Sequence, residues 1–327
     1  MRENYQGYFI PHTREIPRKL GMTIKRESPK INKEFMQLPK KAIITLAGMG
    51  TRFLPATKAQ PKEMLPLIDK PIAQYVVEEM VAAGARDIIM VTKKGGHTIE
   101  DHFDSNFELE EQLKRTGKRD KLKAVVGISK IANFIYLRQK SYMPYGNGTP
   151  LRVAADLVSD GPFFYAFGDM LAQSKTPMAQ QLLKIYQKNP EAAAVVAAYP
   201  VARKLVSHYG IFKIKPGTKN ELERVVEKPG PAEAPSNLMN AGRFLFTAKI
   251  LPIIRKMKIG KDNELWLVDA IQILVDQGEK VLVQACEGKF CDTGDPLNYL
   301  KTTLDFALER ADLKDELKKY IAEKLKK

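Results

Sequence analysis

Two glycines and two basic residues follow an apolar run, and their types suit the binding of a polyphosphate. The apolar run covers residues 42–46 and predicts a buried strand. Gly48 and Gly50 come next, and a glycine turn lets the backbone approach a ligand with successive N–H groups exposed. Arg52 adds a bidentate phosphate donor, and Lys62 adds a mobile point charge. The pattern predicts a triphosphate site at the end of a strand.

Two common glycine loops do not match this segment. A dinucleotide fingerprint requires a third glycine at the position that Phe53 occupies. A P-loop requires Gly-Lys-Ser/Thr after a four-residue gap, and the sequence has no such run. If the two glycines are considered alone, an ordinary strand-to-helix turn is the alternative interpretation. The neighbouring Thr51-Arg52 and the segment 61–64 argue against it.

The elements that must position these residues alternate between strands and helices from Lys40 onward, which predicts an α/β layered fold. A residue that follows a strand in such a fold, such as Asp169, stands where open sheets bind ligands, although it also suits a turn cap. Residues 121–136 are ambiguous between helix and strand. The patterns predict helices at 72–83, 97–103, 107–114, 153–157 and 304–325, the last interrupted near Asp312, strands at 87–92, 163–167 and 192–199, and a β-pair of 211–215 with 223–227.

The composition narrows the class of protein. The chain has 327 residues, enough for one large domain or two ordinary ones, and 44% of them are hydrophobic, as in globular proteins. It has no apolar run of about eighteen residues, and residues 1–40 lack the apolar core of a signal peptide. Cys286 and Cys291 are the only cysteines, so neither a disulfide framework nor a zinc site is expected. These features predict a cytoplasmic protein without a membrane anchor.

The formal net charge of +15 raises the hypothesis of nucleic-acid binding. Much of the basic excess lies in the segments 1–40 and 314–327. No basic motif interleaved with aromatic residues is present, and a cleft for two phosphorylated substrates already favours positive charge. We therefore expect no nucleic-acid partner.

The segment 41–75 closely resembles the nucleotidyltransferases that make nucleoside-diphosphate sugars, and within them the bacterial-type UTP–glucose-1-phosphate uridylyltransferases. The resemblance runs from about Met36 to at least Tyr299. The later segments that carry it, in the expected order, are His102-Phe103-Asp104, Phe107-Glu108-Leu109-Glu110, Val226-Glu227-Lys228-Pro229, Ala234-Pro235-Ser236-Asn237-Leu238, Gly242-Arg243-Phe244 and Leu267-Val268-Asp269-Ala270-Ile271.

The resemblance implies a Rossmann-like nucleotidyltransferase fold of the glycosyltransferase A-like kind, with a mixed, mostly parallel sheet flanked by helices. Residues 36–300 would form the nucleotidyltransferase domain with a sugar-binding subdomain, and residues 301–327 a helical tail. Residues 1–35 match nothing in the family. We expect either a disordered basic extension or a wrongly assigned start, with Met36 as the true first residue.

The same resemblance implies the transfer of a uridylyl group from UTP to α-D-glucose 1-phosphate, with release of pyrophosphate. Such a reaction needs cations that align two anions and neutralise the growing charge. Arg52 and Lys62 would hold the triphosphate, and Lys228 the sugar phosphate. Asp169 and Asp292 would bind Mg²⁺, which prefers a few carboxylates with phosphate oxygens and water, although Asp292 also suits a turn or helix cap.

Further residues complete the implied site, and a homodimer or homotetramer is the implied assembly. Gln139 offers a donor and an acceptor that suit a uracil edge. Glu227 would accept hydrogen bonds from sugar hydroxyls. The nucleotide-binding set is Ala47, Gly48, Met49, Gly50, Thr51, Gln139 and Gly146, and the sugar-binding set is Gly168, Tyr209, Gly210, Glu227, Lys228 and Gly242.

The sequence departs from the family pattern at two places. The link 140–145 is longer than usual, and Thr149-Pro150 replaces the usual His-Ala. Trp266 stands where a glutamine is common, and an indole can fill core or stack on a sugar but cannot copy an amide's hydrogen bonds. The alternatives are therefore the same chemistry with dTTP or another hexose 1-phosphate, or a non-catalytic regulatory homologue.

Overall fold

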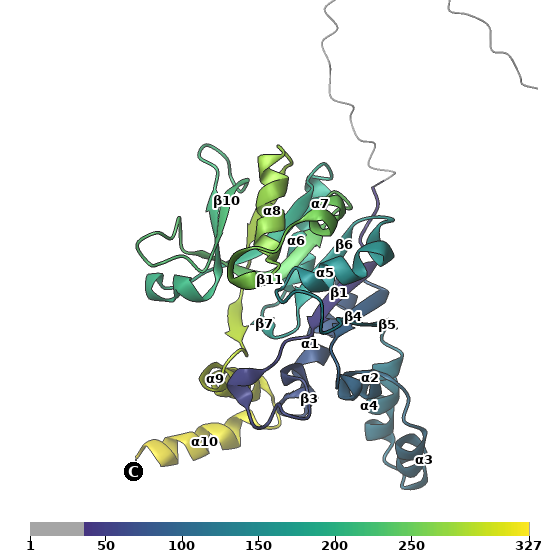
Figure 1. Ribbon diagram of the computed structural model, residues 1–327. Helices are drawn as coiled ribbons and strands as arrows, with labels where there is room; N and C mark the ends of the chain where they lie inside the picture. Colours follow the sequence, from purple (N-terminus) through teal and green to yellow (C-terminus); the bar gives the residue numbers. More distant parts are fainter. Residues whose placement is uncertain (1–35, 327) are drawn as a thin grey trace, which may run out of the picture. The chain divides into compact units, whose positions relative to one another are not determined.

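A mixed nine-stranded sheet forms the centre of the computed structural model, which describes residues 36–326 (Figure 1). The predicted extension 1–35 lies outside the described residues. The strands of the sheet are β1 (Lys41–Leu46), β4 (Asp87–Thr92), β5 (Asn133–Arg138), β6 (Phe163–Phe167), β8 (Ala194–Pro200), β9 (Gly210–Ile214), β10 (Leu222–Glu227), β11 (Leu238–Phe246) and β12 (Val281–Ala285).

The strand order is β10-β9-β11-β6-β1-β4-β5, and β8 pairs with both β11 and β12. Only β10 and β11 run opposite to the other strands of this sheet. The predicted α/β fold with a mixed, mostly parallel sheet is therefore confirmed. The predicted β-pair across Pro216-Gly217 is also confirmed as β9 and β10.

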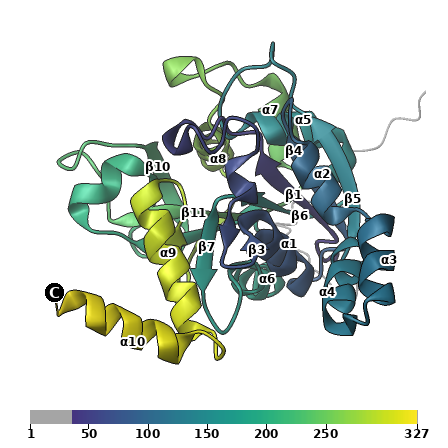
Figure 2. The same ribbon diagram turned by 90° about the horizontal axis from the view of Figure 1, so that it is seen from below.

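Helices cover both faces of the sheet because successive strand residues point to opposite sides. On β1, Ile44 packs into the core beneath α1 (Ile72–Ala82) and α6 (Met178–Lys188). Its neighbour Ile43 packs into the core on the other face. That face is covered by α5 (Thr149–Ala154), α7 (Ile250–Lys256) and α8 (Leu267–Asp276) (Figures 1 and 2).

A group of three helices lies at the β5 end of the sheet (Figures 1 and 2). These helices are α2 (His97–Phe103), α3 (Phe107–Arg115) and α4 (Arg119–Ser129). The first two confirm predicted helices. The ambiguous segment contains both states, because α4 ends at Ser129 and β5 then follows with Phe134 and Tyr136 packed on the core.

The last helices differ in their start from the prediction. Helix α9 (Pro296–Glu309) begins eight residues earlier than the predicted start at Leu304, and it crosses the predicted boundary at residue 300. The Asp295 carboxylate accepts from the Asn298 N–H at 3.0 Å, so Asp-Pro forms the N-cap and first turn. The predicted interruption near Asp312 is confirmed, since α10 (Lys314–Leu325) is a separate helix.

Short elements complete the described chain. The predicted helix at 153–157 begins earlier, as α5, and ends as a 3-10 turn. Within residues 36–326, no helix combines the length and apolar character that crossing a bilayer requires. The remaining elements are β2 (Pro66–Leu67), β3 (Lys70–Pro71), β7 (Met170–Gln173), β13 (Lys289–Asp292) and the 3-10 turns η2 (Thr51–Phe53), η3 (Lys62–Met64), η4 (Ala155–Val158), η5 (Arg203–His208) and η6 (Lys261–Asn263).

The sheet directions bring several predicted residues to one edge. Strands β1, β4, β5 and β6 are parallel neighbours, so their carboxyl ends meet. The glycine loop after β1, Lys93 after β4, Gln139 after β5 and Asp169 after β6 all leave the sheet there. This edge is where doubly wound sheets bind their ligands.

Candidate active site

The glycine loop is fixed by hydrogen bonds to its own backbone. Gly50 has φ 65°, a left-handed conformation that favours glycine, and a Cβ there would lie 3.2 Å from Thr57 Cβ. The Thr57 hydroxyl donates to the Gly50 carbonyl at 2.7 Å. The Lys93 ammonium donates to the Gly48 carbonyl at 2.7 Å. The loop thus includes one cation, Arg52, and a second cation, Lys93, contacts it from outside.

Lys62 and Asp169 form an ion pair at the end of this loop. The Lys62 ammonium donates to Asp169 Oδ2, and both side chains are mostly buried. Burial alone would lower the pKa of Lys62, but the charges of Asp169 and Glu63 raise it well above its ordinary value. Burial would likewise raise the pKa of Asp169, and pairing with Lys62 lowers it instead. Both groups are therefore charged at neutral pH.

Asp169 and Asp292 lie beside each other at the end of a two-stranded sheet. Strand β7 pairs antiparallel with β13, and Asp292 is directly opposite Met170, the residue after Asp169. The Thr293 hydroxyl fixes the turn by donating to the Asp169 carbonyl at 2.5 Å. Burial and the neighbouring charge of Asp169 raise the pKa of Asp292. A divalent cation at this pair would relieve the repulsion between the two carboxylates.

The pair would need ligands from elsewhere to complete a metal site. Within residues 36–326, no group of three or more His, Cys, Asp or Glu side chains is arranged to hold a metal ion. Two carboxylates suit a cation that takes its other ligands from phosphate oxygens and water. Arg52 lies beside the same turn, with Nη1 3.4 Å from the Gly294 carbonyl oxygen. The turn at residues 292–294 therefore meets the glycine loop through Arg52.

Tyr209 joins this carboxylate pair to the predicted sugar-binding residues. Its hydroxyl donates to Asp292 Oδ2 at 2.9 Å, and its carbonyl accepts from the Lys228 N–H at 3.1 Å. Gly210 follows, and a Cβ there would lie 2.9 Å from Glu227 Oε2. The absence of a side chain at Gly210 thus leaves room for the Glu227 carboxylate. The structure brings these four predicted residues together.

Glu227 and Lys228 face different surroundings although they are neighbours. Burial raises the pKa of Glu227 to about 7, against the opposing charge of Lys228. Lys228 is half-exposed, and its Nζ lies 3.9 Å from Glu227 Oε1 and 4.5 Å from the ring centroid of Trp266. Its φ of 44° is uncommon for a residue other than glycine.

The predicted base-binding residues lie in a loop that packs against the segment before α8. The Gln139 amide lies 3.4 Å from the Pro144 carbonyl, within the loop itself. Gly146 has φ 115°, and a Cβ there would lie 2.4 Å from the Leu265 carbonyl oxygen. Close approach to Leu265 is therefore a structural reason for this glycine. The predicted Ala47, Met49 and Thr51 lie in the glycine loop, where Met49 and Thr51 are exposed.

Arg243 supports the site from within the core, a role that the sequence analysis did not assign. Its guanidinium donates to the carbonyl oxygens of Phe167 at 2.9 Å and Met170 at 2.6 Å, on both sides of the Gly168-Asp169 turn. It also donates to Glu79 Oε2 at 3.0 Å. An arginine between apolar strand residues was the signal in the sequence. The predicted Gly168 and Gly242 let the chain pack closely around this turn.

Glu63 is a second residue that the sequence analysis did not single out. Its side chain is 2% exposed, and burial raises its pKa to about 7. Among the side-chain atoms that the structure describes, Glu63 Oε2 is one of the few buried oxygens without a hydrogen-bond partner. Its place in the motif 61–64, directly after Lys62, was the available signal.

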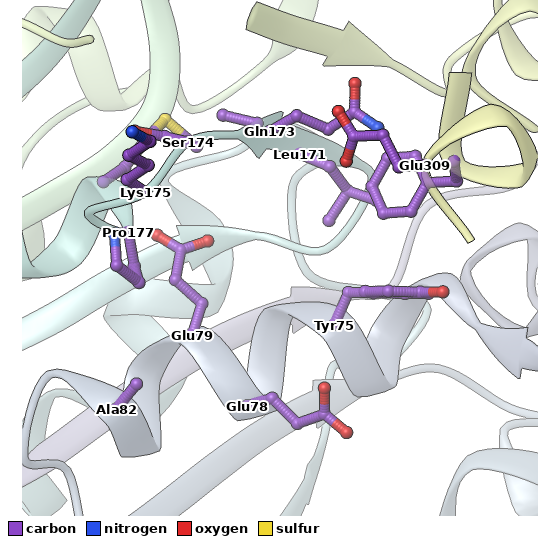
Figure 3. A pocket seen from close by; sticks show the side chains of 13 residues that line it. Tyr75, Glu78, Glu79, Ala82, Leu171, Gln173, Ser174, Lys175, Pro177 and Glu309 are labelled. Atoms are coloured by element: carbon purple, nitrogen blue, oxygen red, sulfur yellow. The ribbon is translucent and has the colours of Figure 1, made fainter. Parts of the chain in front are cut away.

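A separate pocket between α1, β7 and α9 does not contain these residues (Figure 3). Glu78 and Glu79 line it, but Glu78 pairs with Lys70 and Glu79 with Arg243. Their charges are thus already balanced within the protein. The candidate active site is the edge of the sheet at Asp169, and the pocket is a different surface.

The fold and the site define an α/β protein with a glycine loop, neighbouring cations and a carboxylate pair at the carboxyl edge of its sheet. The model of the family described as "Nucleotidyl transferase" matches residues 41–308. The UTP–glucose-1-phosphate uridylyltransferase of Bacillus subtilis (strain 168) is 41% identical over 284 residues, which cover 86% of this chain and 96% of the relative. The enzyme of the same name from Staphylococcus haemolyticus is 41% identical, over 88% of this chain and 99% of its own length.

Solved structures agree with these relatives. A UDP-glucose pyrophosphorylase complexed with UDP-glucose is 33% identical, with a TM-score of 0.75, and covers 84% of this chain and 100% of its own. A UTP-bound UGPase from Acinetobacter baumannii is 34% identical, with a TM-score of 0.77, and covers 88% of this chain and 99% of its own. The chain belongs to the nucleotidyltransferase family. Members of this family generally use a divalent metal.

Proposed function

We propose that this protein transfers a uridylyl group from UTP to α-D-glucose 1-phosphate and releases pyrophosphate. The observation that carries the proposal is the hydrogen bond from Tyr209 to Asp292, because it joins the surroundings of Lys62 to those of Lys228. Two phosphate-binding lysines on either side of a carboxylate pair suit a reaction that aligns two phosphorylated substrates. The names of the relatives specify UTP and glucose 1-phosphate for those proteins, which supports the same pair here.

Arg52 and Lys62 would bind the triphosphate of UTP in the glycine loop. The loop residues Gly48 and Gly50 leave backbone N–H groups open to a phosphate. Lys62 is paired with Asp169 in this structure, and because an ammonium has three donors, Lys62 can bind a phosphate oxygen while it keeps this carboxylate. Ala47, Met49 and Thr51 would contact the nucleotide from the same loop.

Gln139 and Gly146 would lie at the uracil, and the segment from Tyr209 to Lys228 at the sugar. The Gln139 amide can pair with both a donor and an acceptor on the base. Glu227 would accept hydrogen bonds from sugar hydroxyls, and Lys228 would bind the sugar phosphate. The remaining sugar contacts come from Tyr209 and from Gly168, Gly210 and Gly242.

The chemical step needs no covalent enzyme intermediate. A phosphate oxygen of glucose 1-phosphate attacks the α-phosphorus of UTP, and the bond from that phosphorus to the β-phosphate oxygen breaks. Negative charge moves to the departing pyrophosphate. Arg52 and Lys62 stabilise this charge, while Lys228 holds the attacking phosphate in line.

Asp169 and Asp292 would hold Mg²⁺ in this enzyme. Their side chains lie at the end of β6 and on β13, within mutual electrostatic influence, and both are largely buried. Mg²⁺ prefers one or two carboxylates together with substrate phosphates, which matches this donor set. The bound ion would supply charge neutralisation on the phosphate oxygens.

Pyrophosphate release by the purified full chain tests the proposal. The assay contains Mg²⁺, glucose 1-phosphate and each of UTP, dTTP, ATP, CTP and GTP in turn. We expect strong selectivity for UTP, loss of turnover with EDTA and recovery with excess Mg²⁺. No pyrophosphate from any triphosphate and sugar-phosphate pair would reject the proposal, and tight UTP binding without turnover would favour a regulatory homologue.

A second candidate keeps the chemistry and changes a substrate to dTTP or another hexose 1-phosphate. The observation that favours it is the contact between the two departures from the family pattern. The Tyr145 carbonyl, at the end of the longer link, accepts from the Leu265 N–H at 2.7 Å, and Leu265 directly precedes Trp266. A matrix of triphosphates against hexose 1-phosphates separates this candidate from the first, because base choice depends on few hydrogen bonds.

We also propose a cytoplasmic location and a homodimeric or homotetrameric assembly. Cys286 and Cys291 are both free and buried, which suits a reducing compartment. The assembly rests on the family resemblance alone. Light scattering of the purified protein measures it.

A further inference from the structure

The ammonium of Lys228 lies over the face of Trp266. The Nζ atom is 4.5 Å from the ring centroid, within the range of a cation–π contact. Trp266 is only 8% exposed, whereas Lys228 is half-exposed, so the indole forms a wall and the ammonium lies on its outer side. We infer that Trp266 is a positioning residue for Lys228 and thereby sets the affinity for the sugar phosphate. This inference rests on the proposed function of Lys228.

An aromatic face positions a lysine without occupying its N–H groups. An ammonium has three donors, and a carboxylate or amide partner would take at least one of them. The nearest carboxylate oxygen, Glu227 Oε1, is 3.9 Å from Lys228 Nζ, which is longer than a hydrogen bond. The ring therefore holds the charge in place and leaves its donors for an incoming phosphate.

The backbone directs the Lys228 side chain toward the ring. Lys228 has φ 44°, a left-handed conformation that only a minority of non-glycine residues adopt. Its N–H donates to the Tyr209 carbonyl at 3.1 Å, which holds this conformation. A strained residue in a site is consistent with a side chain whose direction matters.

Hydrogen bonds on both sides fix the position of Trp266. The carbonyl of Leu265 accepts from the Gly148 N–H at 2.8 Å, and the N–H of Leu267 donates to Asn147 Oδ1 at 2.8 Å. The indole is also part of the buried core beneath α8. The loop that contains the predicted base contacts Gln139 and Gly146 thus holds the ring in place. The ring in turn contacts Lys228, the lysine that we propose for the sugar phosphate.

Two substitutions at Trp266 separate positioning from core filling. Trp266→Leu removes the aromatic face, and Trp266→Phe keeps one with a weaker quadrupole. We expect the KM for glucose 1-phosphate to rise about 2- to 30-fold in Trp266→Leu, with recovery in Trp266→Phe, while the KM for UTP changes less than about twofold. Equal effects of both variants on both substrates would indicate core filling alone and overturn the inference.

A double-mutant cycle with Lys228→Met tests the coupling directly. If the ring acts through the lysine, Trp266→Leu adds little to the KM for glucose 1-phosphate in the Lys228→Met background. Additive effects would overturn the inference even when each single variant weakens binding. Melting temperatures identify any variant whose loss comes from unfolding.

The intrinsic fluorescence provides a readout that does not depend on turnover. Trp266 is the only tryptophan among the 327 residues, so all tryptophan emission comes from this ring. We expect Lys228→Met to change the emission and to abolish its response to glucose 1-phosphate. Lys249→Met is the control, since Lys249 is an exposed partner of Glu279 on the surface.

The outcomes separate this inference from the proposed function. If the wild-type protein turns over and the effects in the double-mutant cycle are additive, the positioning role of Trp266 is rejected and the proposed function is retained. Absence of turnover with every substrate pair rejects the function. In that case an emission response to glucose 1-phosphate that requires Lys228 still supports the positioning role, and a response that persists in Lys228→Met rejects it.

Discussion

The two lysines of the site are held in opposite ways. Lys62 is mostly buried and bound to the Asp169 carboxylate, whereas Lys228 is half-exposed over the Trp266 ring. A buried charge without a partner is strongly unfavourable, so the end of the site that we propose for the triphosphate carries its own counter-ion. The end that we propose for the sugar phosphate is open to solvent, and its lysine needs only orientation.

This difference has a consequence for the order of events. A phosphate that binds Lys62 must share the ammonium with the Asp169 carboxylate, and the repulsion between the two anions would favour a cation beside them. A phosphate that binds Lys228 displaces no hydrogen-bonded partner that the structure records on Lys228 Nζ. We therefore expect the triphosphate end to reorganise on binding and the sugar end to accept its ligand with little change.

The largest expected effect is at Lys62. Lys62→Met removes the phosphate contact and leaves Asp169 buried without its cation, so we expect kcat to fall about 10²- to 10³-fold. The measurement is the rate of UDP-glucose formation at saturating substrates. Lys70→Met is the matched control, because Lys70 also pairs with a carboxylate, that of Glu78, but lies outside the site. A loss of less than about tenfold would show that the ion pair is only structural.

The next effect is at Lys228. Lys228→Met removes charge-assisted hydrogen bonds to the sugar phosphate, each worth about 1.5–3 kcal/mol, so we expect a KM for glucose 1-phosphate about 10- to 100-fold higher. The KM for UTP should change little, since Lys228 lies at the other end of the site. Steady-state kinetics with each substrate varied in turn measure both values. An equal rise in both KM values would contradict the division of the site into a triphosphate end and a sugar-phosphate end.

A smaller effect concerns pH at Glu227. Burial raises its pKa to about 7, so the carboxyl is protonated below that pH and ionised above it. The ionised carboxylate is acceptor-only, whereas the protonated carboxyl presents one oxygen as an O–H donor. We expect the KM for glucose 1-phosphate to fall as pH rises from 6 to 8, by up to about tenfold per pH unit below the pKa. Glu227→Gln should show only the pH dependence of the substrate phosphate.

The stability of the fold should decrease as pH rises, whereas the affinity for glucose 1-phosphate should increase. The folded pKa of Glu227 is about 7 and its ordinary value is 4.5, so the folded protein holds the proton more tightly than the unfolded chain. The resulting stabilisation is complete below pH 4.5 and is lost as pH rises through about 7. Relative to Glu227→Gln, the wild-type melting temperature should therefore decrease with pH. A constant difference would indicate an ordinary pKa.

The smallest effect concerns the backbone of Lys228. A left-handed conformation is less favourable for a residue with a Cβ by about 1–2 kcal/mol. Lys228→Gly should therefore melt higher than Lys228→Ala by about 2 °C or more, although both lack the charge. Differential scanning fluorimetry measures the difference. A lower melting point for the glycine variant would show that this conformation is unstrained.

The local motifs of the site were predictable because each residue type has its own physical reason. The strand before Gly48, the strand before Asp169 and the β-pair before Lys228 follow from apolar runs and turn residues. The ambiguous segment 121–136 was not resolved, because a short apolar run suits a helix and a strand equally. The missed start of α9 had a signal in Asp295-Pro296, an N-cap residue followed by a proline at the first helical position, which the sequence analysis did not use.

The contacts between distant segments were not predictable from one sequence. No spacing rule joins Asp169 to Asp292, and their proximity comes from the pairing of β7 with β13. The burial of Arg243 and Glu63 depends on packing from several elements, which charge and periodicity do not reveal. The cation–π contact of Trp266 likewise requires the three-dimensional neighbour Lys228, although the sequence already marked Trp266 as unusual.

The backbone bonds between the loop ending at Gly148 and the segment before α8 make these two regions one unit for design. The Leu265 N–H and carbonyl bond to the backbone of Tyr145 and Gly148, so a segment of another length at 140–149 would displace both partners, and loss of Asn147 would remove the side-chain acceptor of the Leu267 N–H. A chimaera that exchanges 140–149 together with 264–267 keeps both sides of this contact from one parent. Substrate preference in this protein should therefore be transferable only as a paired graft.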